Sequence, residues 1–316
     1  MLVAYHLAAE LLPDYSSEFS RHDFTLPQLF ACLVVKEMLG RSYRGAEELL
    51  RDSQHWCRAI GMSKTPDHNT LWRAANFLLG RSKTNRFLDI ICQWGTRARM
   101  LGLSIKPLAI DSSCFEPHHV SRYFDHRRLH GRKDGGRGRR RKMRAIPKLA
   151  LGVSCWSHLV LSLWTGIGGG GDHPHFESVL FDAWRRTPGR SLKKVVADAG
   201  YDAERNHELA RQDMTIRSII PATIGRRFVN GSPPRGRWRR QMRLLLRTKR
   251  SRRRCDYTQR WQIETVNSML KRNLGSACRG KTSKSRQSDL RLKVLTHNLM
   301  ILRRQKRVET GHSRPF

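Results

Sequence analysis

Apolar residues recur at helical spacing through the first hundred residues of the chain. Thr25 and Gln28 form a capping-box pattern ahead of the apolar run LPQLFACLVVKEML, and Gly40 is a natural helix stop. Ser42 then opens a second amphipathic stretch, YRGAEELLRDSQHW, and a third helix is expected around Leu71. This spacing predicts short helices separated by tight polar turns.

We therefore expect residues 1–103 to form an all-α N-terminal domain. Short helices joined by tight turns suit a helix-turn-helix module that binds DNA. They suit a helical dimerisation or cap domain equally well, because no recognition helix stands out in the pattern. Both interpretations stay open at this point.

From about residue 104 the pattern changes to short apolar runs of strand length. One long run predicts two strands joined by a turn near residues 156–158, and helical stretches lie between and after the later strands. The predicted strands are SIKPLAID, the hairpin KLALGVSCWSHLVLSLWTG, KKVVADAG and IRSIIPATI. A hairpin followed by alternating strands and helices indicates a mixed α/β sheet covered by helices. Glycines 168–171 predict a flexible link between a strand and the next helix, and Asp172 is the predicted cap at its end.

A polar stripe begins at Tyr257. Tyr257, Arg260, Glu264 and Lys271 are spaced i, i+3, i+7 and i+14, so on a helix they project within about 60° of one another. A separate apolar face, centred roughly 110° away, holds Ile263, Val266, Leu270 and Leu274. One face of this helix therefore carries a carboxylate, two cations and a phenol beside a stripe that can pack.

Two aspartates each end an apolar run. Asp111 closes LAIDSS and Asp198 lies in VVADAGYD, where Gly200 allows a tight turn and Asp202 can cap the next helix. Strand ends open into the crevices where ligands bind in α/β sheets. Taken alone, either aspartate is more simply read as a loop cap.

The charge balance narrows the class of partner. The 316-residue chain has a formal net charge of +35 and an isoelectric point near 11.3. Self-repulsion on this scale favours a polyanionic partner, and nucleic acid is the usual one. A membrane-surface role is the rival, but the basic residues do not form one long cationic amphipathic helix.

Two segments concentrate the positive charge. Residues 127–148 hold 11 Lys or Arg, and residues 226–254 hold 13 with no acidic residue. We interpret them as basic loops, with the second extending over 222–256, that contact backbone phosphates; Trp238 is a candidate for base stacking. A charge run is more often merely a solvated segment.

Seven scattered cysteines without a C-x-x-C pair indicate a reducing compartment. The N-terminal run MLVAYHLAAELL is interrupted by His6 and Glu10, so it is a poor signal peptide. No apolar run approaches about 18 residues, so we expect no membrane helix and a cytoplasmic protein.

The three acidic residues gain meaning together. Mg²⁺ binds carboxylate oxygens, water and substrate phosphate, and two ions about 4 Å apart promote phosphodiester displacement. Asp111, Asp198 and Glu264 inside a strongly basic protein would supply local negative charge for metal and positive charge elsewhere for DNA.

The spacing Tyr257-x2-Arg260-x3-Glu264-x6-Lys271 resembles the Y-R-E-K signature of bacterial insertion-sequence DDE transposases. VVADAGYD resembles the stretch around the second aspartate of that family, and LAIDSS the stretch around the first. The separations are also similar, with 86 residues between Asp111 and Asp198 and 65 between Asp198 and Glu264. The likeness extends from about residue 20 to residue 305.

The resemblance implies a ribonuclease-H-like catalytic domain over residues 104–308, followed by a C-terminal tail at 309–316. It implies that Asp111, Asp198 and Glu264 are catalytic and bind two Mg²⁺ ions, with Mn²⁺ as a substitute. Tyr257, Arg260 and Lys271 would contact DNA phosphates. The implied activity is cleavage at the terminal inverted repeats followed by strand transfer by the freed 3′-hydroxyl.

The same resemblance makes double-stranded DNA, as transposon ends and target, the expected partner. Pairing two ends makes a homodimer on DNA plausible, in the cytoplasm and associated with the nucleoid. The alternative is a catalytically inactive DNA-binding protein derived from a transposase. The intact acidic triad and signature favour the enzyme.

Overall fold

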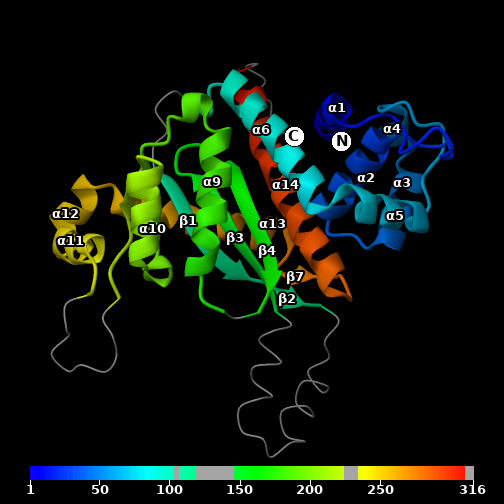
Figure 1. Ribbon diagram of the computed structural model, residues 1–316. Helices are drawn as coiled ribbons and strands as arrows, with labels where there is room; N and C mark the ends of the chain where they lie inside the picture. Colours follow the sequence, from blue (N-terminus) through cyan, green and yellow to red (C-terminus); the bar gives the residue numbers. More distant parts are fainter. Residues whose placement is uncertain (103–106, 119–145, 169, 224–233, 310–316) are drawn as a thin grey trace, which may run out of the picture. The chain divides into compact units, whose positions relative to one another are not determined.

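The computed structural model describes residues 1–102, 107–118, 146–168, 170–223 and 234–309 (Figure 1). By its internal contacts the chain divides into two compact units. The helical unit comprises residues 1–94, 115–147 and 269–316, and the sheet unit comprises residues 95–114 and 148–268. Among the described residues, no helix combines the length and apolarity that a membrane crossing requires.

The helical unit contains the N-terminal helices and the long C-terminal helix. Its helices are α1 (Leu2–Leu11), α2 (Leu26–Met38), α3 (Tyr43–Asp52), α4 (Gln54–Arg58), α5 (His68–Leu78), most of α6 (Arg81–Arg97) and α14 (Ser283–Glu309). A short parallel pair, β2 (Glu116–Pro117) with β7 (Ala277–Cys278), belongs to the same unit.

The predicted helix starts in this unit are confirmed. Thr25 and Gln28 form the complete capping box of α2, and the Ser42 side chain accepts from the Gly45 N–H at the start of α3. Gly40 follows α2 with a φ of +61°, a left-handed conformation that suits glycine after a helix. These starts are set by local hydrogen bonds, which is why the sequence predicts them.

Helix α2 is the core of the helical unit. It is buried along almost its whole length and contacts α1, α3, α5 and α14. Phe30 of α2 stacks on Phe87 of α6 with ring centroids 4.2 Å apart. Because α2 is apolar on all sides over residues 29–35, it must be enclosed by other helices, and α14 supplies part of that enclosure.

The sheet unit is built on five strands in the order β4-β3-β1-β5-β6. Strand β1 is central, antiparallel to β3 and parallel to β5, and β5 is parallel to β6. The strands are β1 (Leu108–Cys114), β3 (Pro147–Ser154), β4 (Val160–Ile167), β5 (Lys194–Ala197) and β6 (Arg217–Ile219). The predicted hairpin is confirmed, since β3 and β4 are adjacent and the Ser154 N–H donates to the Leu159 carbonyl at the turn.

Helices flank this sheet. Helix α9 (Phe176–Arg186) packs on β4 and β1 and lies in front of the sheet in Figure 1. Gly152 of β3 permits the approach, because a Cβ there would lie 3.2 Å from Val179 of α9. The other helices of the unit are α10 (Glu204–Glu208), α11 (Arg237–Leu245), α12 (Lys249–Arg254) and the first part of α13 (Trp261–Leu274).

Four short 3₁₀ turns and one π-helical turn complete the described part of the unit. They are η1 (His173–His175), η2 (Pro188–Arg190), η3 (Ala199–Tyr201), the π-helical η4 (Leu209–Asp213) and η5 (Tyr257–Arg260). The predicted fold class is thereby confirmed at the level of a mixed α/β sheet flanked by helices with a helical N-terminal region.

The predicted basic loop at 222–256 is wrong over its second half. Helices α11 and α12 form there, with Met242 and Leu246 buried beneath exposed arginines. Charge density suggested a loop, but arginine is a good helix former and two apolar side chains are enough to dock short helices. Residues 224–233, residues 119–145, which include most of the predicted basic loop at 127–148, and the tail from 310 lie outside the described residues.

Candidate active site

Asp111 and Asp198 lie on neighbouring parallel strands. The last registered pair of β1 and β5 is Ile110 with Ala197, and each aspartate is the next residue along its chain. Backbones of adjacent strands are about 5 Å apart, so the two carboxylates leave the sheet side by side. The prediction that Asp111 ends its strand is wrong, because β1 continues to Cys114 through pairing with β3.

The surroundings of Asp111 oppose its negative charge. The pKa of Asp111 is raised to about 6, chiefly by burial and also by the charges of Asp198 and Asp172. The Ser112 backbone N–H and Arg260 act in the opposite direction. Asp111 is half-buried and lies near two other carboxylates, so its ionised form is disfavoured unless a cation binds beside it.

Asp172 is a neighbouring carboxylate that the sequence reading assigned to a helix cap. Its side chain makes no capping hydrogen bond to η1. Instead it accepts a hydrogen bond from the Ser112 hydroxyl, and its Oδ1 lies 2.6 Å from the Lys148 ammonium. A Cβ at Gly200 would lie 3.0 Å from Asp172 Oδ2, so the glycine of the DAGYD segment makes room for this carboxylate.

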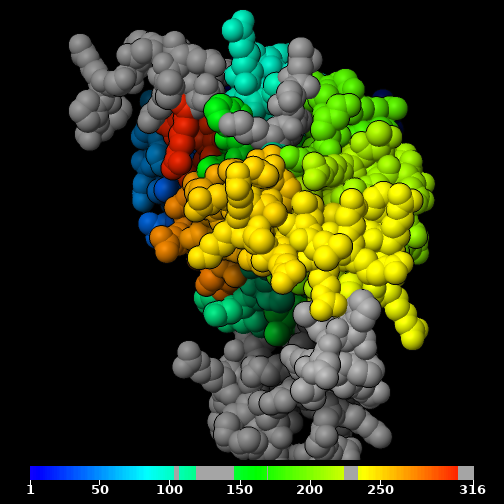
Figure 2. All heavy atoms as spheres, turned by 90° about the vertical axis from the view of Figure 1, so that its left-hand side faces the viewer, coloured from blue at the N-terminus to red at the C-terminus, as the bar shows by residue number. Residues whose placement is uncertain are grey.

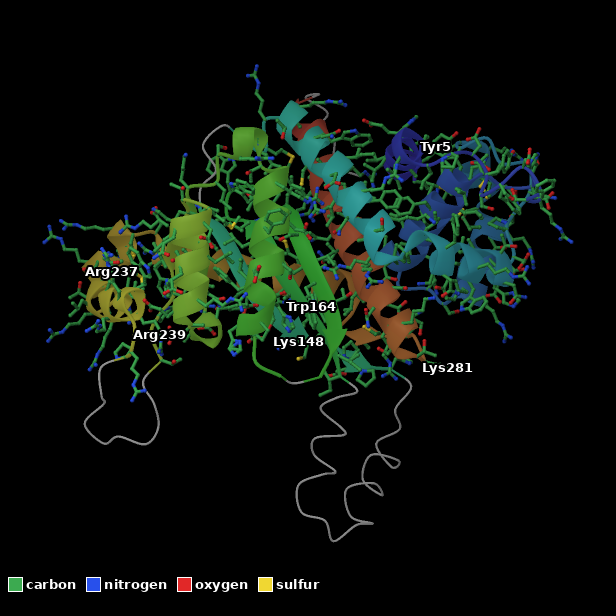
Figure 3. All side chains as sticks on the ribbon, in the orientation of Figure 1. Tyr5, Lys148, Trp164, Arg237, Arg239 and Lys281 are labelled. Carbon is green, nitrogen blue, oxygen red and sulfur yellow. The ribbon has the colours of Figure 1, made fainter. Side chains whose placement is uncertain are left out.

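Lys148 is the buried counter-charge of this cluster. Its side chain is only 6% exposed, and its ammonium also donates to the Gly170 carbonyl at 2.5 Å. Figure 3 shows it on the sheet, near Trp164 of the adjacent strand. Because Lys148 neutralises Asp172, the uncompensated negative charge at this edge stays with Asp111 and Asp198.

The polar stripe starts in a 3₁₀ turn and continues into a helix. Tyr257 and Arg260 belong to η5, and Glu264 lies in the first turn of α13, so the predicted single α-helix from Tyr257 holds only from Trp261 onward. Asp256, in the left-handed region with φ +63°, redirects the chain just before the turn. The 3₁₀ turn retains the i, i+3 spacing that places Tyr257 and Arg260 on one side.

Several contacts hold this turn against the sheet. The turn η5 packs on β1 and β5, the two strands that carry the aspartates. The Lys194 ammonium lies 2.5 Å from Asp256 Oδ2, and His158 Nε2 lies 2.6 Å from Gln262 Oε1. Tyr257 and Arg260 therefore come close to the aspartates through packing of elements distant in sequence.

Arg260 links the stripe to the aspartates. Its guanidinium lies 2.6 Å from Glu264 Oε1. Burial works to lower the pKa of Arg260, but Tyr257, Glu264 and Asp198 together raise it. For Tyr257, burial raises the pKa of the phenol, while the nearby charge of Arg260 works to lower it.

Asn267 contacts one of the predicted acids, although the sequence pattern did not single it out. Its amide donates to Asp111 Oδ2 at 3.3 Å, which ties α13 to β1. It follows Glu264 by three positions, so the same helical spacing that grouped the stripe could have found it. Its buried Oδ1 has no hydrogen-bond partner among the described residues.

Lys271, the last residue of the predicted signature, belongs to the helical unit. Its ammonium lies 5.4 Å from the centroid of the Phe115 ring, a cation–π contact within that unit. The structure thus brings Asp111, Asp198, Tyr257, Arg260 and Glu264 together within the sheet unit, and it places Lys271 in the other unit.

The donor set is chemically suited to a hard divalent cation, since carboxylate oxygens are what Mg²⁺ prefers. Asp111 and Asp198 already stand side by side. Glu264 is held in an ion pair with Arg260 instead. Accordingly, within the described ranges no group of three or more His, Cys, Asp or Glu side chains is arranged to hold a metal ion.

Helices α11 and α12 form the arginine-rich segment 237–254, named the basic insertion, and this segment is anchored beside the site. Asp202, whose side chain is fully buried, accepts from Arg239 Nε at 2.9 Å and from Arg239 Nη2 at 2.7 Å. Glu204 accepts the first backbone N–H groups of α11, from Trp238 and Arg239. The expected role of Asp202 as a helix cap is wrong; it docks the insertion.

The insertion presents a basic surface. Figure 2 shows α11 and α12 in yellow on the face of the sheet unit that is turned to the viewer, and Figure 3 shows Arg237 and Arg239 on α11. Trp238, considered for base stacking, has the guanidinium groups of Arg211 and Arg237 within 5 Å of its ring centroid, at 4.6 and 4.8 Å. Its ring is engaged within the protein.

Comparison with protein families gives two matches. The family described as "Transposase DDE domain" matches residues 103–299. The family described as "Transposase domain (DUF772)" matches residues 3–76. Comparison with curated proteins found no match.

Proposed function

Because the chain belongs to the insertion-sequence DDE transposases, as the match over residues 103–299 shows, we propose that it binds the terminal inverted repeats of its element and cuts and joins DNA there. Membership of this family makes the protein a nuclease of the transposase class. The observation that carries the proposal is the adjacency of Asp111 and Asp198 next to the Arg260–Glu264 pair, in a protein of net charge +35.

The catalytic residues of this proposal are Asp111, Asp198 and Glu264. DDE transposase domains generally use divalent metal ions, and these three carboxylates would hold Mg²⁺, with two ions expected and Mn²⁺ as a substitute. Bound there, the ions would activate the attacking oxygen and stabilise the leaving oxygen of the phosphodiester. The charge repulsion at Asp111 supports the assignment, because a cation would relieve it.

Arg260 has a double role in this proposal. Without DNA it neutralises Glu264; with DNA it binds a backbone phosphate, whose two non-bridging oxygens suit its planar fork. Transfer of Arg260 from Glu264 to the phosphate would free the glutamate to join the two aspartates. Tyr257 and Lys271 would bind neighbouring phosphates of the cut end.

Asn267 and Asp172 position the acids. The Asn267 amide orients Asp111 from α13. Asp172 accepts a hydrogen bond from Ser112, the residue after Asp111 on β1, and Lys148 neutralises the charge of Asp172. Neither needs to touch the substrate. Both restrict the rotation of groups that must hold a fixed geometry during phosphoryl transfer.

The proposal extends to the architecture. The central β1, antiparallel to β3 and parallel to β5, supports a ribonuclease-H-like catalytic domain over residues 104–308. Residues 1–103 would contribute to recognition of the element ends, and two copies would meet on paired ends. Association with the nucleoid would follow from DNA binding.

A nicking assay tests the proposed function. Purified protein is incubated with DNA that carries the ends of the element, in Mg²⁺, in Mn²⁺ and in a chelator. We expect cleavage at the ends with either metal and none with the chelator. Binding without cleavage in either metal would favour instead a catalytically inactive DNA-binding protein derived from a transposase.

A further inference from the structure

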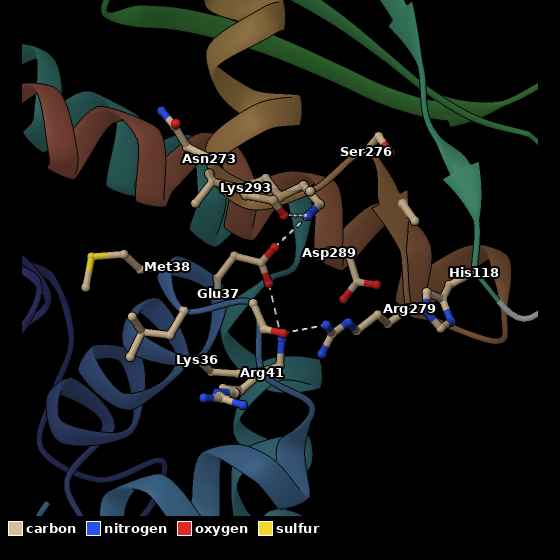
Figure 4. A pocket seen from close by; sticks show the side chains of 15 residues that line it. Lys36, Glu37, Met38, Arg41, His118, Asn273, Ser276, Arg279, Asp289 and Lys293 are labelled. Atoms are coloured by element: carbon tan, nitrogen blue, oxygen red, sulfur yellow. Dashed lines mark hydrogen bonds and ion pairs between the residues drawn. The ribbon is translucent and has the colours of Figure 1, made fainter.

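The helical unit contains a polar pocket of about 440 Å³ that the proposed catalytic residues do not touch. It lies between the end of α2, the segment that follows α13, and α14 (Figure 4). This volume is within the usual range of small-ligand sites. Its lining is mainly charged and polar, so it is not a gap in an apolar core.

The inner wall of the pocket is a fixed ion network. Glu37 accepts from the Lys293 ammonium at 2.8 Å and from the Lys36 ammonium at 3.2 Å, and Lys293 also donates to the Leu274 carbonyl. All three charged side chains are at least 92% buried. Because these groups satisfy one another, they form a rigid wall rather than a binding group.

Asp289 offers an acceptor in the pocket. Its Oδ2 accepts the Gly280 N–H at 2.8 Å, while its Oδ1 receives no hydrogen bond from any described residue. Burial raises the pKa of this carboxyl, and Glu37 adds to the rise while Lys36 works against it. Figure 4 shows the Asp289 carboxylate between Glu37 and Arg279. An acceptor held in this position suits a ligand that brings a hydrogen-bond donor.

The mouth of the pocket is cationic. Arg41 and Arg279 are both exposed. Arg279 donates to the Gly40 carbonyl, which fixes its guanidinium while most of its five N–H donors stay available. Two arginines at a pocket mouth suit a phosphate group.

Taking DNA binding from the proposed function, we propose that this pocket receives one nucleotide of bound DNA whose base has left the stack. The backbone phosphate lies at Arg41 and Arg279, and the exocyclic amino group of the base donates to Asp289 Oδ1. Removing a base from the stack is what enzymes that act on duplex DNA do when a base must be reached.

The chemistry selects the ligand. Inorganic phosphate alone would satisfy the arginines but would meet the Asp289 carboxylate, which repels it. A nucleotide with an amino-bearing base satisfies both ends of the pocket. Thymine carries the O4 carbonyl where cytosine carries its amino group, and this oxygen cannot donate to Asp289 and is repelled by its charge, so the pocket discriminates against thymine.

The test measures binding of the deoxynucleoside monophosphates dCMP and TMP, and of inorganic phosphate, to the full-length protein by calorimetry. We expect dCMP to bind about tenfold more tightly than TMP or phosphate, the usual effect of one hydrogen bond to a charged acceptor. A duplex with one unpaired cytosine should likewise bind more tightly than the same duplex with an unpaired thymine. Equal binding of dCMP, TMP and phosphate would overturn the proposal.

Two variants and one control separate the parts of the pocket. Asp289→Asn keeps an acceptor for the Gly280 N–H and replaces the free acceptor by a donor, so the preference for dCMP should vanish or reverse. Arg279→Gln should weaken all nucleotides alike. Lys281→Gln removes the same charge two residues away, outside the lining, and should change nothing.

The nucleotide-binding measurements test the pocket independently of DNA cleavage. Glu264→Gln should retain the dCMP preference, because Glu264 does not line the pocket. An Asp289→Asn protein that keeps the dCMP preference would refute the nucleotide site while end cleavage continued. Loss of metal-dependent cleavage in the unaltered protein would instead refute the proposed function.

Discussion

Arg260 Nη2 lies 2.6 Å from Glu264 Oε1, across the junction between the 3₁₀ turn η5 and helix α13. The two residues are four positions apart, and the carboxylate is 55% exposed while the guanidinium is 25% exposed. A pair this accessible to water contributes little to stability. It is therefore easily exchanged, and a DNA phosphate is a suitable competitor for the arginine.

Glu264→Gln tests the catalytic part of this relationship. The substitution keeps the shape of the side chain and removes the charge that would hold a metal ion. We expect cleavage of the element ends to fall by on the order of 10³-fold or more, since such an ion contributes several kcal/mol to the transition state. A gel assay with Mg²⁺ measures the rate.

The same variant distinguishes catalysis from structure. Arg260 loses its partner and becomes free for phosphate, so DNA binding at constant salt should be unchanged or tighter. Arg260→Gln should weaken binding and cleavage together. If Glu264→Gln reduced binding as strongly as cleavage, Glu264 would be structural.

The insertion helices predict a change in salt dependence. Arg247, Arg250 and Arg254 are exposed on or beside α12, and replacing all three by Gln should flatten the plot of log K against log salt. Each lost phosphate contact reduces the slope by about 0.9. Fluorescence anisotropy with labelled DNA at several salt concentrations measures it. An unchanged slope would place these arginines away from DNA.

Asp202→Asn should destabilise the sheet unit. The fully buried carboxylate accepts two hydrogen bonds from Arg239 and two from Thr223, and its loss leaves the arginine without a charged partner. Breaking a buried pair in this way costs about 3 kcal/mol. Denaturant unfolding measures the free energy, and trypsin should cleave the released α11–α12 segment faster.

An exposed pair provides the control for this prediction. Glu177 and Arg205 lie 3.3 Å apart with side chains 56% and 84% exposed, so Glu177→Gln should change the free energy of unfolding by less than about 0.5 kcal/mol. If Asp202→Asn had as small an effect, the insertion would be docked by its apolar contacts alone.

His207 predicts a pH-dependent stability. Burial, with a further contribution from Arg211, lowers the pKa of His207 from 6.5 to about 4 in the folded protein. The unfolded chain therefore binds this proton first as the pH falls. Stability from the neutral ring is complete above about pH 6.5 and is lost down to about pH 4, a decrease of about 3 kcal/mol.

Unfolding curves between pH 4 and pH 7 measure this decrease. His207→Asn should be less stable at pH 7 and should show a shallower pH dependence, because the buried titrating group is absent. His22→Asn, at an exposed position, should retain the full dependence. Equal slopes for the unaltered protein and His207→Asn would contradict the prediction.

Local patterns in the sequence were sufficient for most of the secondary structure. The Thr25–Gln28 box and the β3–β4 hairpin were predictable because a few neighbouring residues make the hydrogen bonds that define them. Arginine density was misleading at 237–254, since charge says nothing of the two apolar residues that dock those helices.

For the candidate site, too, some features were predictable from the sequence and others depend on tertiary contacts. The spacing of the stripe and the contexts of the two aspartates were enough to predict the family, which the family match confirms, and the three acids that we propose as catalytic. Their adjacency depends on the parallel register of β1 and β5, which no local pattern specifies. The roles of Asp172 and Asn267 likewise depend on contacts across 60 and 156 residues.

The sequence by itself determined the family and most element starts and predicted the acids, because these depend on residue identity, spacing and local hydrogen bonds. Only the tertiary structure decided that the turn η5 packs on β1 and β5, that Asp202 anchors the insertion, and that Asp289 faces a pocket. Those outcomes depend on which distant segments pack together, and burial then fixes which charges meet.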